Sequence, residues 1–587
     1  MIRLTSLLRV TIAIPALAAA ALSLAAQQIP ALRTFQPQDL FRVRKVGAVA
    51  WSPDGRHAAI ELSSPGRTLD SSIPTSEIQL LDVKTRTLRT LSSPGTQYLG
   101  FFNAVWSPSG KRLAFLSVDS NAVVQMWTWR VGAAAPVPVR DYDLRFAFGD
   151  PSVAWISDDR IAIVAWDVGA EKDGELYFRI LKGRNVADKW KQAFSAQSPS
   201  VAILDSGGPA AVAPPSVRII AIDLNTNIPT TLARGRLHRL ALSEDQHFIT
   251  FNRENPGLPG QSVASYIGLA DAEQGYAAVN WGTERHVIDA RSGKEVDPSL
   301  FPAQTSKPIP KDASTQAPPR PDARKLAASP DGDASLYLAN ASDGTHLLIC
   351  GGGNRPASSC AEIWHANEWM QQIKAGKAES FSYTALDGTP LTAWLLLPPD
   401  YSPGTRLPVV TIVYPTSMFG AAPPWNFSLF QNDFEHPQLF AAMGYVVLMP
   451  SMPPAKDPAD AHALALLPNG VLPAVDALIA RGIADPDRIA VVGQSNGGFA
   501  TLGLITQSNR FRSAIASAGF SDLVSLYGTF YGQYRYGDAG PPQKGQVFRM
   551  LQVEKGDETM GGPPWAQLDR YRTNSSVLSA DKVQTPL

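Results

Sequence analysis

Cysteine, net charge and long apolar runs are all scarce in this sequence. Two of the 587 residues are cysteines, and 52 basic residues balance 52 acidic ones. This balance argues against a nucleic-acid binder, which needs a basic excess to displace the counterions of the phosphates. With 44% hydrophobic residues the chain has enough apolar material for a core, so wholesale disorder is excluded. The 45 glycines and 48 prolines indicate many turns and argue against a mostly helical protein.

The one extended apolar run lies at the N-terminus. Arg3 and Arg9 precede the segment Val10–Ala26, which ends in small residues. A basic start, an apolar stretch and a small-residue end are typical of a secretory signal. The run is rich in alanine and falls short of the ~20 strongly apolar residues of a stable membrane span. We therefore expect residues 1–26 to be a cleaved signal peptide, and the mature protein to be periplasmic or secreted.

Export affects how the two cysteines are interpreted. Cys350 and Cys360 flank a flexible glycine-rich loop, and in an oxidising compartment they are able to form a disulfide. Two free buried thiols are the alternative, and the sequence leaves both open. No histidine-rich tract or second cysteine cluster accompanies them, so we expect no metal site, and we expect no cofactor.

A turn phrase recurs across residues 40–372. Its copies begin at Trp51, Trp106, Trp155, Leu242 and Ala328, and the first reads Trp-Ser-Pro-Asp-Gly. Each copy combines a strand end, a tight turn and a strand of alternating apolar residues. A second phrase, a strand ending in an Asp-containing turn, recurs at residues 78–82, 217–223 and 286–289.

The repeats are roughly 50 residues apart, or twice that, which is the spacing of propeller blades. An irregular β-sandwich would not need one turn phrase at a nearly fixed period. We therefore predict a β-propeller over residues 40–372, with the number of blades left open. Residues 195–215 and 297–324 lack this pattern and are expected to be exposed loops.

Residues 377–587 change to strands that alternate with helices. A hairpin is predicted around Asp387-Gly388. The strands predicted after it are residues 407–414, 445–449, 488–492 and 513–517, and the predicted helices are residues 439–443, 471–481 and 498–507. Nearly continuous apolar strands suit a parallel sheet covered by helices on both faces. The predicted fold class is an N-terminal β-propeller followed by an α/β-hydrolase domain.

The motif that carries chemistry follows the strand at 488–492. Gly493-Gln494-Ser495-Asn496-Gly497-Gly498 contains Gly-x-Ser-x-Gly, the sharp strand-to-helix turn that exposes a serine hydroxyl at the edge of a sheet. Gly493, Gly497 and Gly498 are small because a larger side chain would collide with a neighbouring strand or helix. We predict that Ser495 is a nucleophile and that the backbone N–H of Asn496 helps to bind an oxyanion.

The domain order and the segment Gly493–Phe499 resemble the prolyl oligopeptidase family of serine peptidases, which includes dipeptidyl and acylaminoacyl peptidases. The resemblance implies that Tyr414 is a second oxyanion donor, although Pro415 follows where relatives often carry glycine. A tyrosine that only caps the strand is the alternative. The resemblance also implies that Tyr527 and Tyr531 line a pocket for an apolar substrate residue, and core packing of both rings is the alternative.

The sequence lacks the partners that a serine nucleophile needs. A histidine must accept the hydroxyl proton, and in α/β-hydrolases an acid and then the histidine follow the serine. All eight histidines precede Ser495. His436 and His462 are the candidates to replace the absent histidine as the base, and a structural role is favoured for both. We therefore expect a hydrolase truncated at its C-terminus, with the last part of the domain missing, and inactive in this form.

These observations predict an exported serine peptidase that hydrolyses short peptides through an acyl-enzyme on Ser495. No Glu-Glu pair occurs, which argues against a dipeptidyl peptidase without excluding it. An esterase or other acyl hydrolase on the same site is the alternative enzyme. A third interpretation is a non-catalytic protein whose propeller binds a partner. The expected ligand is a short peptide, and the oligomeric state is left open.

Overall fold

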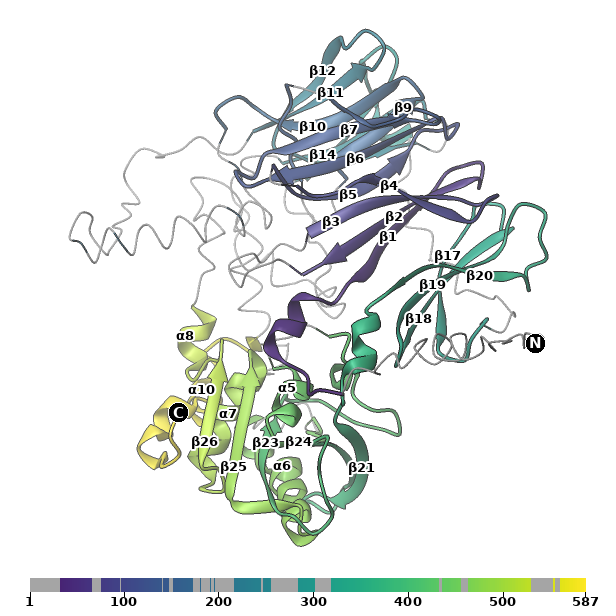
Figure 1. Ribbon diagram of the computed structural model, residues 1–587. Helices are drawn as coiled ribbons and strands as arrows, with labels where there is room; N and C mark the ends of the chain where they lie inside the picture. Colours follow the sequence, from purple (N-terminus) through teal and green to yellow (C-terminus); the bar gives the residue numbers. More distant parts are fainter. Residues whose placement is uncertain are drawn as a thin grey trace, which may run out of the picture.

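The structure is a computed structural model. It describes residues 32–65, 75–95, 97–139, 141–146, 151–170, 172, 180, 191, 195, 216–243, 246–254, 283–300, 318–431, 435–454, 463–528, 553–554 and 560–587. The predicted signal peptide and most of the predicted loops at 195–215 and 297–324 lie outside these residues. In Figure 1 the strands of the first two-thirds of the chain lie above a separate unit formed by the last third.

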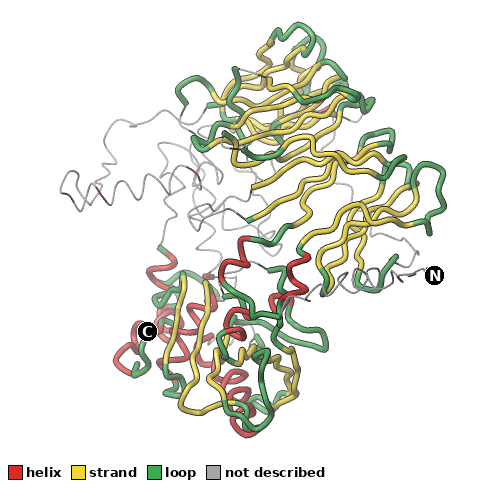
Figure 2. Tube along the Cα trace, in the orientation of Figure 1, coloured by secondary structure: helices red, strands yellow, loops and turns green. Residues whose placement is uncertain are grey.

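Five four-stranded antiparallel sheets follow one another from residue 45 to residue 366 (Figure 2). In each sheet the four strands pair in chain order. The strands are β1 (Lys45–Trp51), β2 (His57–Ser64), β3 (Thr75–Asp82) and β4 (Thr87–Ser92); β5 (Tyr98–Trp106), β6 (Arg112–Asp119), β7 (Val124–Arg130) and β8 (Val137–Val139); β9 (Val153–Ser157), β10 (Arg160–Trp166), β11 (Val217–Asp223) and β12 (Pro229–Gly235); β13 (Leu237–Leu242), β14 (Phe248–Glu254), β15 (Thr283–Asp289) and β16 (Glu295–Val296); and β17 (Ala323–Ala328), β18 (Ala334–Ala341), β19 (Gly344–Gly351) and β20 (Cys360–Ala366).

The recurring turn phrase always joins the first and second strands of a sheet. In the first copy Ser52 accepts a hydrogen bond at Oγ from the His57 amide at 2.9 Å, and Gly55 has a φ of 67°. The copy between β13 and β14 repeats the serine bond, from the Phe248 amide to Ser243 Oγ at 2.9 Å. Gln246 takes the place of glycine there and still adopts a φ of 60°. The phrase therefore encodes a turn that needs one residue in the left-handed region.

The tryptophans that precede the turn connect neighbouring sheets. The Trp106 indole N–H donates to the Ala50 carbonyl of the first sheet at 2.8 Å. In the next sheet the Trp155 indole N–H donates in the same way to the Val105 carbonyl at 3.0 Å. Both rings are buried. In the second and third sheets the repeat thus places a large apolar ring between two sheets and satisfies a backbone carbonyl of the preceding one.

The first sheet packs against both the second and the fifth. One apolar cluster joins the first and second sheets through residues such as Ile78 and Phe115. Another cluster joins the first and fifth sheets, with Ile60 and Leu81 on one side and Leu336 and Ile349 on the other. The second, third and fourth sheets share the largest cluster of this part of the chain. The first and last sheets of the series are therefore neighbours in space.

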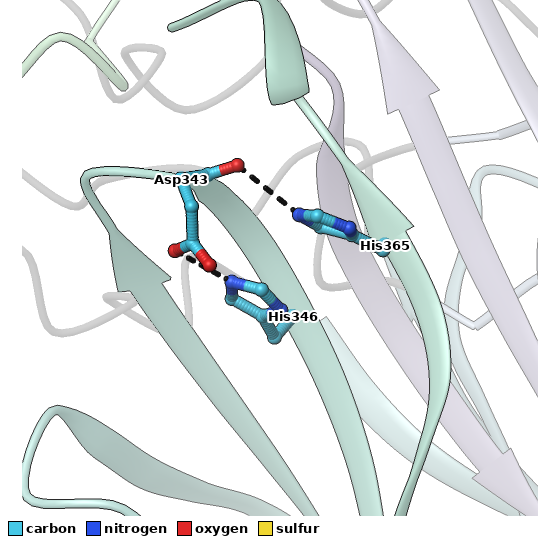
Figure 3. A group of neighbouring side chains, drawn as sticks. All are labelled: Asp343, His346 and His365. Carbon is cyan, nitrogen blue, oxygen red and sulfur yellow. Dashed lines mark hydrogen bonds and ion pairs between the residues drawn. The ribbon is translucent and has the colours of Figure 1, made fainter. Parts of the chain in front are cut away.

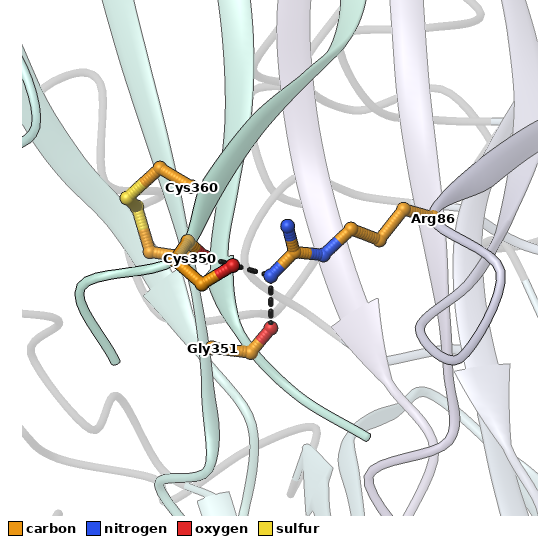
Figure 4. Close-up of a disulfide and its surroundings, with 5 residues drawn as sticks. Arg86, Cys350, Gly351 and Cys360 are labelled. Carbon is orange, nitrogen blue, oxygen red and sulfur yellow. Dashed lines mark hydrogen bonds between the residues drawn. A yellow bond between two sulfur atoms is a disulfide. The ribbon is translucent and has the colours of Figure 1, made fainter. Parts of the chain in front are cut away.

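Polar contacts add to the junction between the first and fifth sheets (Figure 4). Arg86, in the turn after β3, donates from one guanidinium nitrogen to the Gly351 and Ser359 carbonyls at 2.8 and 2.7 Å. These carbonyls lie beside Cys350 and Cys360, which are opposite each other on β19 and β20 and form a disulfide. Of the two alternatives that the sequence left open, the structure has the disulfide.

The last third of the chain forms a six-stranded sheet in the order β21-β22-β24-β23-β25-β26. β21 and β22 are an antiparallel hairpin around Gly388, and the four strands from β24 to β26 run parallel. The elements are β21 (Lys377–Thr384), β22 (Pro390–Leu397), β23 (Leu407–Ile412), η6 (Trp425–Phe427), α5 (Pro437–Ala442), β24 (Val446–Met449), α6 (Ala463–Ala480), β25 (Ala484–Gln494), α7 (Asn496–Gln507), β26 (Ser513–Ser517), α8 (Leu523–Tyr527), α10 (Leu568–Thr573) and η8 (Ser576–Lys582). This arrangement confirms the predicted hydrolase-like domain.

Helices cover both faces of this sheet. Side chains of β22 alternate between the faces: Leu395 belongs to the cluster under α6 and α7, whereas Trp394 and Leu396 belong to the cluster under α5. β26 is the edge strand of the described sheet, and its Ala514 amide donates to the Pro586 carbonyl at 2.8 Å.

No helix among the residues described is both long and apolar enough to cross a membrane.

An N-terminal segment connects the two parts of the molecule. The 3-10 helix η1 (Pro37–Phe41) precedes β1, and a second one, η5 (Glu368–Gln372), follows β20. Arg33, shortly before η1, forms an isolated parallel β-bridge with Ile373, the residue after η5. Phe35 stacks on His436 of the C-terminal domain with ring centroids 4.8 Å apart. The fully buried His436 ring bonds through Nε2 to the Gln431 carbonyl at 3.1 Å, and burial lowers its pKa to about 4.

We expect Trp106→Phe to lower the free energy of unfolding by about 1–3 kcal/mol, because the Ala50 carbonyl loses its donor while the apolar contact is largely kept. Urea unfolding followed by circular dichroism measures the change. Trp425→Phe is the matched control, since that ring is 67% exposed. A loss of equal size in both variants would contradict a special role for the indole bond.

Stability is also expected to fall as the pH drops from 6.5 toward 4. In the unfolded chain His436 takes up a proton near pH 6.5, whereas in the folded protein its pKa is about 4. The unfolded state therefore binds more protons in this window, which costs up to about 3 kcal/mol of stability below pH 4. His436→Gln should flatten this part of the pH–stability curve in denaturant titrations. An unchanged slope would refute the assignment to His436.

Candidate active site

Ser495 lies at the carboxyl end of β25, where the strand turns directly into α7. Its backbone has φ 56° and ψ −120°, a conformation that side-chain-bearing residues rarely adopt. The turn is held from the neighbouring strand, because the Ser495 amide donates to the Ser517 carbonyl at 2.9 Å. Ser495 is exposed, while Asn496 beside it is buried. The structure thus has the strand–turn–helix geometry that the motif predicts.

The glycines around Ser495 are required by close backbone contacts. A Cβ atom on Gly493 would lie 2.2 Å from the Gly497 carbonyl oxygen, inside the turn itself. A Cβ atom on Gly497 would lie 2.4 Å from the Val413 carbonyl oxygen at the end of the adjacent β23. On Gly498 it would lie 2.7 Å from Gly519 Cα, after β26. The three glycines let the helix start flush against two strands, and this contact projects Ser495 outward.

Two predicted oxyanion donors lie at this turn. Asn496 is the first residue of α7, so its amide points along the helix axis from the N-terminus, where backbone N–H groups lack carbonyls from a preceding turn. Tyr414 follows β23, the strand next to β25. The Cβ position on Gly497 is 3.5 Å from Tyr414 Cδ2, and the Tyr414 side chain is 46% exposed. The structure therefore brings Tyr414 to the serine-bearing turn.

The two tyrosines predicted for a substrate pocket have different outcomes. Tyr531 lies outside the residues that the structure describes. Tyr527 ends α8 and is buried in the main cluster of the domain, where its hydroxyl donates to Glu554 Oε1 at 2.8 Å. Burial and the Glu554 carboxylate raise the pKa of Tyr527. Its ring meets Tyr571 and Trp565 edge-on, which corresponds to the packing alternative that the sequence left open.

Of the two candidate substitute bases, the structure describes His436, and the partners of its ring do not include Ser495. His436 is fully buried against Phe35 and bonded to Gln431, and His462 lies outside the residues described. Among those residues no histidine hydrogen-bonds to the Ser495 side chain. The arrangement supplies an exposed hydroxyl and two candidate oxyanion donors, so it is suited to hold a carbonyl group for attack.

One group of chemistry-bearing side chains was missed by the sequence analysis. Asp343, His346 and His365 gather on the fifth sheet, far along the chain from the serine motif. The two histidines lie on adjacent strands, and only the strand register brings them together. His346 and His365 are too far apart in the sequence to form a short ligand motif. The expectation of no metal site was based on the absence of such motifs, so it did not cover a pair formed across two strands.

Comparison with known proteins agrees with the site geometry. The family model described as the prolyl oligopeptidase family matches residues 469–564, which include β25, Ser495 and α7. A rice protein (Oryza sativa subsp. japonica) named "Probable glutamyl endopeptidase, chloroplastic" is 30% identical over 248 residues, 38% of this chain and 24% of the relative. The lasso peptide isopeptidase AtxE2 of Asticcacaulis excentricus is 25% identical over 250 residues, 40% of this chain and 32% of the relative. The matched segments thus span a third or less of these curated relatives.

A solved structure has the same fold over most of the chain. The acylaminoacyl peptidase of Pyrococcus horikoshii aligns with 94% of this chain and 87% of its own length, at 14% identity and a TM-score of 0.54. At that identity the alignment shows the fold. Taken with the matched family segment around the serine-bearing turn, it agrees with the resemblance drawn from the sequence: residues 469–564 of this chain match the prolyl oligopeptidase family of serine peptidases, and the fold over most of the chain is similar to that of this acylaminoacyl peptidase.

Proposed function

We propose that this chain is an exported serine peptidase of the prolyl oligopeptidase type, which takes short peptides at Ser495. The observation that carries the proposal is the exposed Ser495 hydroxyl on a strained turn, with the Asn496 amide and the Tyr414 ring beside it. The named relatives include an endopeptidase and an isopeptidase, both of which act on peptide-type bonds. The signal-like N-terminus supports export to the periplasm or the medium.

The proposed chemistry is acyl transfer. Ser495 Oγ attacks the carbonyl carbon of the scissile bond, and the negative charge that develops on the carbonyl oxygen is stabilised by the Asn496 N–H and the Tyr414 hydroxyl. The hydroxyl proton must pass to a base and then to the leaving amine. Since no described histidine bonds to Ser495, we propose that the chain with this sequence holds the nucleophile and oxyanion site but depends on an added base for acylation.

The five N-terminal sheets are proposed to be blades of one propeller, set above the peptidase site. Three observations support this: each sheet is a four-stranded meander, a serine-closed turn joins the first two strands in four of the five sheets, and the first and fifth sheets pack against each other. We place the propeller at residues 40–372 and the hydrolase domain from residue 377. This division agrees with the end of η5 at Gln372 and the start of β21 at Lys377. A propeller over the site would admit short peptides and exclude folded proteins.

The first test is chemical rescue of Ser495. We expect the purified chain to react slowly with a fluorophosphonate probe, and the labelling rate to rise with the concentration of added imidazole, because free imidazole then supplies the base that none of the described histidines supplies. Mass spectrometry locates the adduct on Ser495, and Ser495→Ala remains unlabelled. No adduct at any imidazole concentration would overturn the peptidase proposal and favour a non-catalytic binding protein.

Under the same rescue, peptide anilides and simple esters separate the two enzyme classes. Faster acylation by a blocked short peptide than by an ester of equal leaving-group reactivity supports the peptidase. The opposite order supports an esterase or other acyl hydrolase on the same serine. Both substrates depend on Ser495, so the comparison tests the specificity of the site and leaves the nucleophile assignment to the labelling experiment.

A second test concerns Tyr414. We expect Tyr414→Phe to slow the imidazole-assisted acylation of Ser495 by about 10²–10³-fold, because the oxyanion loses one donor while the ring stays in place. Stopped-time labelling at fixed probe and imidazole concentrations measures the rate. Tyr445→Phe is the control. Tyr445 lies between α5 and β24, so this substitution should leave the rate unchanged. Equal rates in wild type and Tyr414→Phe would limit Tyr414 to a structural role.

A further inference from the structure

The fifth sheet carries two histidines and an aspartate that meet at one end of its strands (Figure 3). His346 on β19 and His365 on β20 are direct cross-strand partners, and their rings stack with centroids 4.2 Å apart. Asp343 lies in the turn between β18 and β19, just before His346. The His346 side chain is only 4% exposed, whereas the Asp343 side chain is 48% exposed. The cluster is therefore buried on the side of His346 and open to solvent on the side of Asp343.

The two ring nitrogens of each histidine face different kinds of partners. Both Nδ1 atoms face a glutamate: His346 Nδ1 lies 2.6 Å from Glu362 Oε2, and His365 Nδ1 lies 3.5 Å from Glu368 Oε1. Both Nε2 atoms face Asp343: His346 Nε2 is 2.9 Å from its Oδ1, and His365 Nε2 is 3.1 Å from its backbone carbonyl oxygen. The two Nε2 atoms thus converge on one residue.

This pattern is characteristic of histidines that bind a metal. A metal-binding imidazole usually donates its other N–H to a carboxylate, which fixes the tautomer and strengthens the ligand. Here Glu362 and Glu368 occupy that outer position for both rings. A simple ion pair of His346 with Asp343 and Glu362 would not require a second histidine whose Nε2 atom faces the backbone carbonyl of the same Asp343. The second ring is therefore informative.

The distances also suit a metal. One ligand atom from each of Asp343, His346 and His365 lies within 4.8 Å of the other two. Zinc bonds of about 2.0–2.2 Å in a tetrahedral site place ligand atoms roughly 3.3–3.6 Å apart. His346 Nε2 and Asp343 Oδ1, which are 2.9 Å apart, already lie this close. The group as a whole must draw together by about 1 Å around the ion, and the half-exposed Asp343 side chain is the member with the most room to turn toward it.

We propose that Asp343, His346 and His365 form a binding site for a divalent transition-metal cation, with Zn²⁺ as the best match. Two imidazole nitrogens and one carboxylate oxygen are a common zinc donor set, and the fourth position would be taken by water on the open side of the cluster. On binding, Zn²⁺ replaces the proton between His346 Nε2 and the Asp343 carboxylate and the proton that His365 Nε2 donates to the Asp343 carbonyl. The first proton is released to solvent, and the second is released or moves to His365 Nδ1, which faces Glu368.

The location suggests a structural effect. The Asp343 carbonyl also accepts a hydrogen bond from Gln371 Nε2 of η5 at 3.1 Å. Glu368, the outer partner of His365, belongs to the same 3-10 helix. η5 leads from the fifth sheet into the hydrolase domain, so a bound cation would fasten this connection to the hairpin of β18 and β19. Arg320 acts against binding through its positive charge near Asp343 and His346, and it is paired with Asp322 at 3.1 Å.

Zinc titration of the purified full chain tests the proposal. After removal of metal with a chelator, isothermal titration calorimetry with ZnCl₂ should give one site per chain and a rise in melting temperature. Asp343→Asn and His365→Phe should each weaken zinc binding at least tenfold, and the phenylalanine keeps a ring stacked on His346. Glu362→Gln should weaken binding by about 10–100-fold, as expected for a residue that supports a ligand.

His286→Gln is the matched control. His286 also lies on a strand of these sheets, beside the Glu295 carboxylate and stacked on Phe251, but among the described residues it belongs to no group of three potential metal ligands. This variant should bind zinc like the wild type. The proposal is overturned if the wild type binds no zinc, or if zinc affinity is unchanged in both Asp343→Asn and His365→Phe. The melting temperature of each variant in chelator shows that it is folded, and His365→Phe alone decides if Asp343→Asn does not fold.

Discussion

The close contact between α7 and two strands is the constraint on which the candidate active site depends. Gly497 lies against the Val413 carbonyl and Gly498 against Gly519, at distances that leave no room for a side chain. Because the helix starts this close to the sheet, the chain must reverse within one residue, and that residue is Ser495 with its φ of 56°. The strain is maintained by the packing of α7 in the largest cluster of the domain. The position of Tyr414 follows from the same contact, since Val413 and Tyr414 are the two residues directly after β23.

The five N-terminal sheets depend on a different device, a tight turn between the first two strands. In the first, second, fourth and fifth sheets a serine hydroxyl closes this turn and a residue with positive φ completes it. In the second and third sheets a tryptophan just before the turn bonds to the preceding sheet. None of these sheets has a complete core of its own, because the apolar clusters are shared between neighbours. Their stability is therefore a property of the series, as in other repeat architectures.

Much of this was predictable because the signals are local. The Ser-Pro-Asp-Gly turns, the hairpin at Gly388 and the strand at Ser513–Ser517 are fixed by residues close in sequence, and the structure has each of them. The helix α6 is longer than its predicted core at 471–481 and starts at Ala463, although it contains Pro468 and Pro473. Tertiary packing against β21 and α7 outweighs the helix-breaking tendency of these prolines here.

What the sequence could not supply were contacts between distant segments. The stacking of Phe35 on His436 and the pairing of His346 with His365 depend on strand register and domain placement, which have no short sequence signature. The disulfide was left open for a similar reason, because only the register places Cys350 opposite Cys360. For Tyr527 the family resemblance implied a place in a substrate pocket, whereas the structure buries its ring in the core of the domain.

The two connections between the domains are bonded to each other. The Arg44 amide donates to Asn367 Oδ1, and Asn367 Nδ2 donates to the Arg44 carbonyl, both at 2.8 Å. The two segments that leave the sheets, before β1 and after β20, are therefore held together at one place. Separating them would break both hydrogen bonds of this pair.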